Sequence, residues 1–207
     1  MSEQPLADRR PIRTRGASWA QQIAHLLAGW NITPNQISVL SVVFAAAGAW
    51  CMLRPGWWLL GAALCIQLRL LCNLFDGMVA VEHDRQTPTG AIYNEFPDRV
   101  ADSLLIVAAG YAAGQPALGW FGALAAALTA YIRVFGGACQ LPQDFRGPMA
   151  KPQRMAVLTM ACLLQAMSNA LPWMTFGVGI IAAGSVLTCV TRTRALSAAL
   201  HARNPAP

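Results

Sequence analysis

Acidic side chains are concentrated in one stretch of this chain, between positions 76 and 102. Six of the nine acidic residues lie there: Asp76, Glu82, Asp84, Glu95, Asp98 and Asp102. Carboxylates at helical spacing could hold Mg²⁺ or Mn²⁺, which prefer oxygen ligands and commonly share them with substrate phosphates. Two such ions bridging a diphosphate would assist an in-line displacement at phosphorus. This stretch is therefore the first candidate for a catalytic site.

Helical spacing places the polar residues of this region on two stripes. Residues three or four positions apart share a helix face, so Arg69, Asn73 and Asp76 form a stripe about 60° wide. The second stripe, about 80° wide, consists of Asn94, Asp98 and Asp102. We expect the two helices to be antiparallel neighbours joined by a short loop, with the stripes facing each other.

The composition predicts the environment of these stripes. Of the 207 residues, 56% are hydrophobic and only 12% are charged, compared with about 25% charged residues in soluble domains. Windows of about 20 apolar residues predict an all-α integral membrane protein with six transmembrane helices. The spans cover residues 34–53, 57–80, 92–114, 116–139, 151–169 and 172–191. An ionisable residue in such a span costs roughly 2.5 to 3.5 kcal/mol at the bilayer centre, so the acidic stretch needs a functional explanation.

The residues that flank the spans predict three further segments. Residues 1–16 are rich in arginine and predict a basic cytoplasmic arm. Residues 17–29 have an amphipathic pattern, which predicts an N-terminal helix lying in the membrane interface. We therefore expect a membrane domain at 17–192, followed by a cytoplasmic C-terminal tail at 193–207.

The first span has a sharp predicted start. Thr33 is a favourable N-cap, and Pro34 suits the first helical position. Gln36 lies three residues after Thr33 and completes a capping box. The first membrane helix is therefore expected to begin at Pro34.

Basic residues predict the orientation of the chain. If the six spans alternate, twelve of the fifteen Lys and Arg residues lie on one side, and only Arg54 lies in a loop on the other. The positive-inside rule then places both termini in the cytoplasm, with the longer connections at 81–91 and 140–150. The chemistry is expected at the cytoplasmic face of a bacterial-type inner membrane. The net charge of +6 follows this membrane pattern and does not indicate nucleic acid binding.

A simpler interpretation of the acidic stretch remains open. The carboxylates could mark a solvated mouth between two helices, with Asp98 and Asp102 paired to Arg99 or Arg85. The joint spacing of polar residues on both helices favours a functional site over this alternative.

The spacing of the two stripes also resembles a family signature. The sequence contains Asn73-x2-Asp76-Gly77-x2-Ala80-Val81-x8-Gly90-x3-Asn94-x3-Asp98. This is similar in spacing to D-x2-D-G-x2-A-R-x8-G-x3-D-x3-D, the signature of the CDP-alcohol phosphatidyltransferase family. Residues 32–38 also resemble the start of that family's first span, and six spans with a cytoplasmic N-terminus are typical of it. The resemblance covers nearly the whole chain.

The resemblance implies transfer of a phosphatidyl or similar group from a CDP-linked donor, such as CDP-diacylglycerol, to an alcohol, with release of CMP. It also implies a homodimer. The residues at positions 73, 76, 94 and 98 would bind two divalent metal ions, and Asp98 would accept the proton of the acceptor hydroxyl. Room for the cytidine and the diphosphate would come from Gly77, Ala80 and Gly90.

Two of the four metal positions depart from the family signature. Asn73 and Asn94 stand where the family has aspartates, so four formal negative charges fall to two. An asparagine still offers its carbonyl oxygen, but this neutral ligand should weaken the binding of two divalent ions. Asp102, one turn beyond Asp98, or Glu95 could restore part of the charge. The sequence leaves open whether one or two Mg²⁺ or Mn²⁺ ions bind.

The arginine of the signature is also replaced, by Val81. Arg69 lies one turn before Asn73 and could take the role of the missing arginine as a ligand of the diphosphate. The alternative is that Arg69 simply pairs with Asp76.

A second basic group lies at the mouth of the fourth and fifth spans. It consists of Arg133, Arg146, Lys151 and Arg154. Arg133 lies within a span and therefore needs a partner or a cavity. The resemblance implies that this region contributes to the acceptor pocket, where basic residues suit a phosphorylated polyol. The other three residues could equally anchor lipid headgroups.

The leading hypothesis is a membrane enzyme of phospholipid synthesis that transfers a phosphatidyl group from CDP-diacylglycerol to an alcohol acceptor. An alternative is an aminoalcohol phosphotransferase with a CDP-alcohol donor, which the basic residues disfavour because such donors carry a cation. A third is a non-catalytic member that binds lipid or nucleotide on the same scaffold, which Asn73 and Asn94 permit. A proton-coupled transporter is disfavoured, because the acids cluster at one mouth rather than at the midplane.

Overall fold

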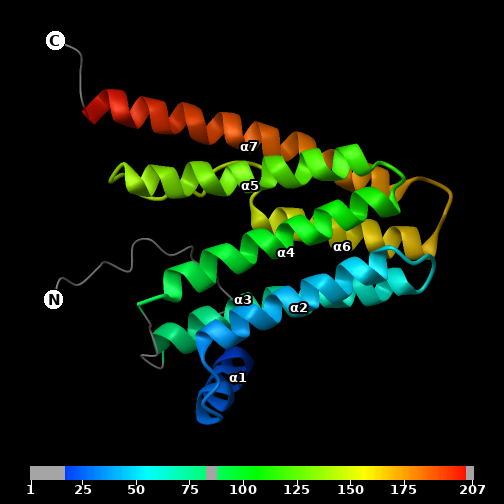
Figure 1. The fold of residues 1–207 in the computed structure, drawn as a ribbon, viewed down its shortest axis with the longest axis horizontal. Helices are drawn as coiled ribbons and strands as arrows, with labels where there is room; N and C mark the ends of the chain where they lie inside the picture. The colour runs from blue at the N-terminus through cyan, green and yellow to red at the C-terminus, as the bar shows by residue number, and fades with distance from the viewer. Residues whose placement is uncertain (1–16, 83–87, 204–207) are drawn as a thin grey trace.

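The computed structural model of the chain describes residues 17–82 and 88–203, and the regular elements in these ranges are all helices. They are α1 (Ser18–Gly29), α2 (Pro34–Met52), α3 (Trp58–Glu82), α4 (Gly90–Ala112), α5 (Pro116–Ala138), α6 (Lys151–Met167) and α7 (Trp173–Arg203) (Figure 1). The predicted basic arm at 1–16 lies outside the described residues, as does Arg85.

Four of these helices, α2, α3, α5 and α7, are long and apolar enough to cross a membrane. Helix α4 has 23 residues but carries the charged stripe in its first half, and α6 has only 17 residues. The described residues thus agree with an all-α membrane protein, in which four of the six predicted spans meet the criteria of length and composition. Helix α7 continues to Arg203 without a break, so the predicted boundary at 192 falls inside a helix.

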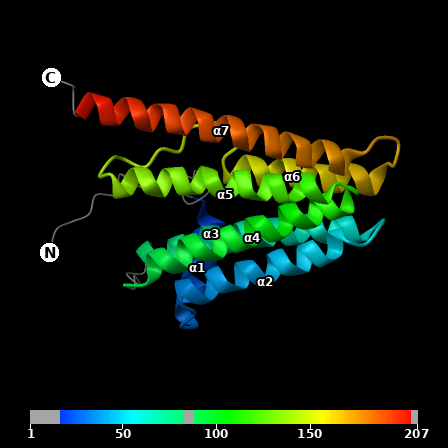
Figure 2. The same cartoon turned by 45° about the horizontal axis from the view of Figure 1, so that its top comes forward.

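The six longer helices lie roughly side by side, and this arrangement persists when the molecule is turned (Figures 1 and 2). The short connections at 53–57, 113–115 and 168–172 gather at one end of the bundle, which we call the turn end. The opposite end holds the first residues of α2, α4 and α6 and the last residues of α3 and α5. We call it the polar end, because both predicted stripes lie towards it.

The helices pack against one another in a defined set of pairs. Helix α2 packs against both α3 and α4, α6 packs against α3 and α7, and α5 packs against α4 and α7. Helices α3 and α4 have few close backbone contacts, but the side chains of their two stripes meet, as Arg69 does with Asp102 and Asn73 with Asp98. Gly48 allows α2 to lie close to α3 and α4, because an added Cβ would lie 3.0 Å from Cys65 of α3 and 3.2 Å from Leu105 of α4.

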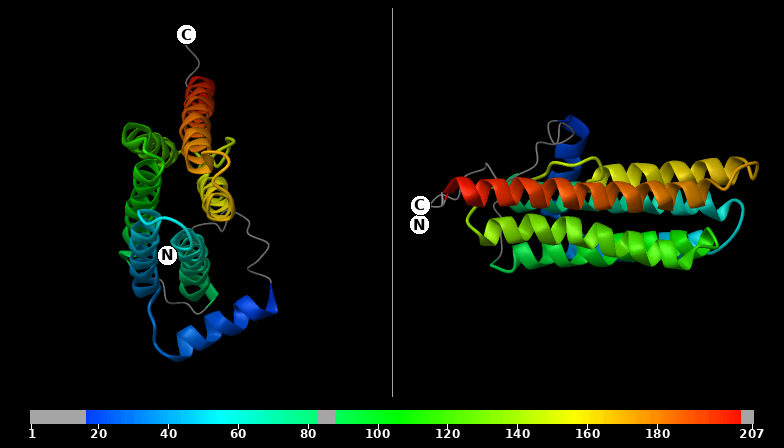
Figure 3. Two further views of the ribbon diagram at one scale, coloured as in Figure 1. Left: turned by 90° about the vertical axis from the view of Figure 1, so that its right-hand side faces the viewer. Right: turned by 90° about the horizontal axis from the view of Figure 1, so that it is seen from above.

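Helix α1 lies across the bundle rather than along it (Figure 3). Its alanines at 20, 24 and 28 are buried, and the helix packs against α3. Trp19, Ile23 and Leu26 are exposed on its other side. The predicted amphipathic helix is therefore present, with small residues towards the protein and large apolar residues facing outwards.

The predicted start of α2 is confirmed in detail. The backbone N–H of Gln36 donates to Thr33 Oγ1 at 3.3 Å, and the backbone N–H of Thr33 donates to Gln36 Oε1 at 2.9 Å. This capping box fixes the first turn of α2, and with it the position of Ser38, which faces the candidate site.

Candidate functional site

Asp98 of α4 is the centre of a polar cluster that joins three helices. Its Oδ1 accepts a hydrogen bond from Asn73 Nδ2 of α3 at 2.9 Å, and its Oδ2 lies 2.5 Å from Lys151 Nζ of α6. The guanidinium groups of Arg69 and Arg99 lie 3.7 Å and 3.9 Å from its two oxygens. The two predicted stripes therefore face each other, and α6 adds a cation to them. The side chain of Asp98 is 14% exposed, compared with 4% for that of Asp102.

Asp102, one turn further along α4, is buried between two arginines. Its Oδ1 lies 2.5 Å from Arg69 Nη2, and its Oδ2 lies 2.7 Å from Arg154 Nη2 of α6. None of these three side chains is more than 4% exposed. Because both carboxylate oxygens are held by guanidinium groups, the geometry disfavours the predicted role of Asp102 as a compensating metal ligand. Arg69 pairs with Asp102 rather than with Asp76.

Further contacts surround this buried cluster of Asp102, Arg69 and Arg154. Arg154 Nη1 donates to the carbonyl oxygen of Met149 at 2.9 Å and lies 3.3 Å from Thr129 Oγ1. The Nε atoms of both arginines are buried and have no hydrogen-bond partner among the described residues. A buried ion pair of this kind depends on near-complete pairing, because each buried ion costs several kcal/mol of desolvation.

Asp76 is the second acid at the polar end that lies outside this buried cluster. It is 6% exposed, and its Oδ2 accepts a hydrogen bond from Ser38 Oγ of α2 at 2.7 Å. Among the described residues, no lysine or arginine forms an ion pair with it. Ser38 could not be selected from the sequence, because a serine in an apolar helix commonly bonds its own backbone.

The small residues of the signature lie beside these acids. Gly77 and Ala80 follow Asn73 along the same half-buried face of α3, and Gly90 is the first residue of α4. Asn94 lies one turn into α4 and is exposed. Their arrangement is consistent with space for a nucleotide diphosphate, which stays a prediction.

The basic residues of the second group do not form one pocket. Arg154 is buried against Asp102, and Lys151 contacts Asp98. Arg133 of α5 lies 2.5 Å from Glu95 of α4 and also contacts Gln143. Glu95 is thus paired with a cation on another helix, which argues against its predicted role in restoring charge to the metal site.

The loop at 139–150 carries the last member of this group, Arg146. Its side chain is 71% exposed, and its Nε lies 2.9 Å from Asp144 Oδ1. Burial alone would raise the pKa of Asp144, but hydrogen bonds from Arg146 outweigh it, so the pKa lies below its usual value. Arg192 of α7 holds this loop by donating to the carbonyl oxygens of Arg146 at 2.8 Å and Thr129 at 2.6 Å. In the sequence, Arg192 is only one of the basic residues after the last span, and its partners depend on tertiary packing.

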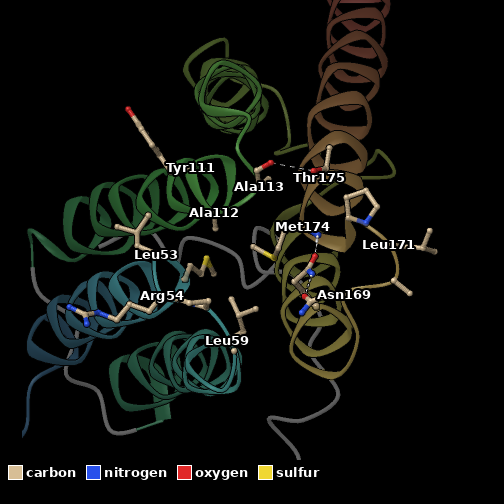
Figure 4. A pocket seen from close by; sticks show the side chains of 16 residues that line it. Leu53, Arg54, Leu59, Tyr111, Ala112, Ala113, Asn169, Leu171, Met174 and Thr175 are labelled. Atoms are coloured by element: carbon tan, nitrogen blue, oxygen red, sulfur yellow. Dashed lines mark hydrogen bonds between the residues drawn. The ribbon is translucent and has the colours of Figure 1, made fainter.

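The turn end contains a pocket of about 650 Å³ with a different character (Figure 4). It is lined mainly by apolar residues and small loop residues, and Arg54 is the only charged residue of the lining. The guanidinium group of Arg54 lies over the ring of Trp50, 4.0 Å from its centroid. The polar lining includes Thr175 and Asn169 (Figure 4). No acidic residue lines this pocket, so it offers no carboxylate for metal-assisted chemistry.

The donors at the polar end fit a divalent ion that is completed by a substrate. Asp76 and Asp98 are the two carboxylates at the signature positions, and the amide oxygens of Asn73 and Asn94 are neutral donors. Mg²⁺ is commonly held by one or two carboxylates together with substrate phosphates, so this set suits such an ion. Within residues 17–82 and 88–203, no group of three His, Cys, Asp or Glu side chains is placed to hold a metal by itself.

The sequence matches the CDP-alcohol phosphatidyltransferase family over residues 31–197. The chain therefore belongs to this family of transferases. It is also 35% identical over 146 residues to a bifunctional IPC transferase and DIPP synthase from Rubrobacter xylanophilus. That match covers 68% of this chain but only 33% of the relative, so the chain spans about a third of that protein's length.

Solved structures show the same fold. Phosphatidylinositol phosphate synthase from Mycobacterium tuberculosis, in complex with manganese and citrate, superposes with a TM-score of 0.74 at 22% identity, over 86% of this chain and 88% of that one. The same protein with CDP-DAG bound gives a TM-score of 0.72 at 22% identity, over 87% and 94%. At this level of identity, the likeness extends to the fold alone.

Proposed function

We propose that this chain is a membrane enzyme of phospholipid synthesis, which transfers a phosphatidyl group from CDP-diacylglycerol to an alcohol and releases CMP. The observation that carries the proposal is Asp98, a partly exposed carboxylate contacted from α3 and α6 within the family signature. The solved neighbour with CDP-DAG bound supports the choice of donor.

In this reaction, the acceptor hydroxyl attacks the phosphorus that carries the diacylglycerol group. The bond from that phosphorus to the CMP oxygen breaks, and CMP leaves with the electron pair. Asp98 accepts the proton of the attacking hydroxyl, which makes the oxygen a better nucleophile. Mg²⁺ or Mn²⁺ held by Asp76 and Asp98, with the amide oxygens of Asn73 and Asn94, would neutralise charge on the diphosphate.

Arg133 and Arg146 are the residues proposed to face the acceptor. Arg133 is partly exposed and reaches from α5 towards Glu95 of α4, and Arg146 lies on the loop above the same end. Two cations that are accessible at the polar end suit a phosphorylated polyol. Arg154 is fully enclosed by Asp102 and Thr129, so its contribution to that pocket would be indirect.

We further propose that α4 and α6 also cross the membrane, which gives six spans with both termini and the site in the cytoplasm. Their buried charged residues, Asp102 and Arg154, face each other inside the bundle, which removes the main objection to their insertion. In intact cells, a membrane-impermeant thiol reagent should label Arg54→Cys but not Ser197→Cys, in a background without reactive cysteines. The opposite pattern would reverse the orientation. A homodimer is proposed from the family resemblance.

The reaction is tested by incubating purified protein in detergent micelles with CDP-diacylglycerol, Mg²⁺ or Mn²⁺, and a panel of free and phosphorylated polyols. We expect CMP and a new lipid to form in equal amounts, and a phosphorylated acceptor to be preferred. Asn169→Ala, at the turn end, is the control for Asp98→Asn and should stay active. A complete lack of CMP with every acceptor and both metals would contradict the proposal.

A second candidate keeps the chemistry but takes the transferred headgroup from a water-soluble CDP-alcohol. The observation in its favour is that the relative at 35% identity is an IPC transferase and DIPP synthase rather than a phosphatidyltransferase by name. Comparing CMP release from CDP-diacylglycerol with release from CDP-alcohols separates the two. If both metal and CDP binding were unchanged by Asp76→Ala and Asp98→Ala, the non-catalytic alternative would be favoured.

A further inference from the structure

The polar end differs from a two-metal site in what surrounds Asp98. Three cationic groups lie within 4 Å of its carboxylate: Lys151 at 2.5 Å, Arg69 at 3.7 Å and Arg99 at 3.9 Å. The family signature supplies four carboxylates for two ions, whereas this chain supplies two at those positions. A second divalent ion at Asp98 would therefore bind beside Lys151 and beside two arginines that also pair with Asp102 and Glu95.

Asn73 explains how the carboxylate of Asp98 finds a hydrogen-bond partner without a second ion. Its Nδ2 donates to Asp98 Oδ1 at 2.9 Å. An aspartate at this position would place a second carboxylate in contact with Asp98, and a cation between them or a proton on one of them would have to relieve the repulsion. The amide removes that requirement, because it acts as a hydrogen-bond donor to Asp98 instead of as a second anion.

Lys151 completes the arrangement from the opposite side. Its Nζ lies 2.5 Å from Asp98 Oδ2, so the ammonium group already supplies a positive charge beside this carboxylate. Lys151 is the first residue of α6, and α6 packs against α3, so the ammonium group is positioned by the helix bundle rather than by a loop. Asp76 has no such cation and hydrogen-bonds to Ser38.

We propose that this site holds one divalent ion instead of two, with the Lys151 ammonium group in the place of the second cation beside Asp98. The single ion is anchored by Asp76 and shared with Asp98, and Lys151 neutralises the other side of the donor's diphosphate. This inference rests on the proposed function and assigns Lys151 to the donor side rather than to the acceptor pocket.

The number of bound ions tests this proposal without any measurement of activity. Purified full-length protein is titrated with MnCl₂ in the presence of CDP, and free Mn²⁺ is counted by its electron paramagnetic resonance signal. We expect one Mn²⁺ per chain in the unaltered protein. The double variant Asn73→Asp, Asn94→Asp restores four carboxylates and should bind two, whereas Asn169→Asp at the turn end should still bind one.

A second titration separates the two assignments of Lys151. Removing a positive charge a few ångströms from the ion should tighten Mn²⁺ binding by about tenfold in Lys151→Gln, because like charges at this range repel each other. Lys151→Arg keeps the charge and should bind Mn²⁺ like the unaltered protein. Arg146→Gln loses the same charge from an exposed position and should also leave the affinity unchanged.

The outcomes distinguish this inference from the proposed function. Two Mn²⁺ ions per unaltered chain, or an unchanged affinity in Lys151→Gln, would overturn the inference and leave the transferase proposal standing. A single ion in the double aspartate variant would also overturn it. No Mn²⁺ binding by the unaltered protein would overturn the inference and the metal-dependent reaction together.

Discussion

The two ends of this bundle are built from the same helices but hold their polar groups in different ways. At the turn end, a pocket of about 650 Å³ has one charged lining residue, Arg54, whose guanidinium group lies over Trp50. At the polar end, Asp98 and Asp102 are each contacted from two other helices. The turn end offers an open pocket without a carboxylate, whereas the polar end offers charges that are held by several helices. We propose the polar end as the reactive site for this reason.

The largest expected effect comes from the acid at the centre of the polar end. Asp98→Asn should lower CMP release by about 10²- to 10⁴-fold, because it removes the general base while keeping the shape of the side chain. Asn169→Ala, at the turn end, should leave the rate unchanged. Equal losses in both variants, measured in the same CMP assay, would erase the functional distinction between the two ends.

Substitution of Asp102 tests whether the buried cluster stabilises the fold. Asp102→Ala leaves Arg69 and Arg154 buried without a counter-charge and should lower the free energy of unfolding by about 3 to 5 kcal/mol. Denaturant unfolding in detergent micelles measures this loss. Replacing both arginines with methionine in the Asp102→Ala background should recover most of it. A stable single variant would show that Asp102 does not organise the cluster.

The loops at the two ends differ in how much an alanine in place of a glycine should destabilise the fold. Gly147 at the polar end has φ +115°, and an added Cβ would lie 2.5 Å from Thr188. Gly56 at the turn end has φ +72° with no atom within 4 Å of such a Cβ. Gly56→Ala should therefore cost about 1 to 2 kcal/mol from backbone strain alone, and Gly147→Ala about 1 to 3 kcal/mol more from the clash. Similar unfolding midpoints for both variants would contradict this difference.

The smallest effect is expected at the exposed pair of Asp144 and Arg146. Because the pKa of Asp144 is lowered in the folded protein, its pair stabilises the fold above the unfolded carboxyl pKa and ceases to do so as the pH falls through the lower, folded value. Exposed pairs contribute little, so Asp144→Asn should barely change the thermal midpoint at pH 7. The difference between the variant and the unaltered protein should shrink further in acid. A large loss at pH 7 would place this loop among the stabilising elements.

Local patterns were sufficient to predict several features of the fold and site. The capping box of Thr33 and Gln36 depends on residues three positions apart, and the structure contains both of its hydrogen bonds. The two polar stripes were predicted from helical spacing, and the contact between Asn73 and Asp98 shows that they face each other. Such features depend on geometry within one helix or between two consecutive ones.

The partners of the charged residues could not be predicted in the same way. Lys151 and Arg154 come from α6, and their contacts with Asp98 and Asp102 depend on how α6 packs against α3. Sequence reasoning therefore assigned Asp102 to the metal and Lys151 to the acceptor. Ser38 was missed for the same reason, because its bond to Asp76 spans 38 positions in the chain.

The central claim is that the polar end binds the diphosphate of a CDP-linked donor. A structure of the protein determined with Mn²⁺ and CDP-diacylglycerol tests it directly. We expect the diphosphate beside Lys151, with Mn²⁺ coordinated by Asp76 and Asp98 and the acyl chains alongside the apolar helices. A diphosphate bound in the pocket at the turn end, with no ion at Asp76 and Asp98, would contradict the account.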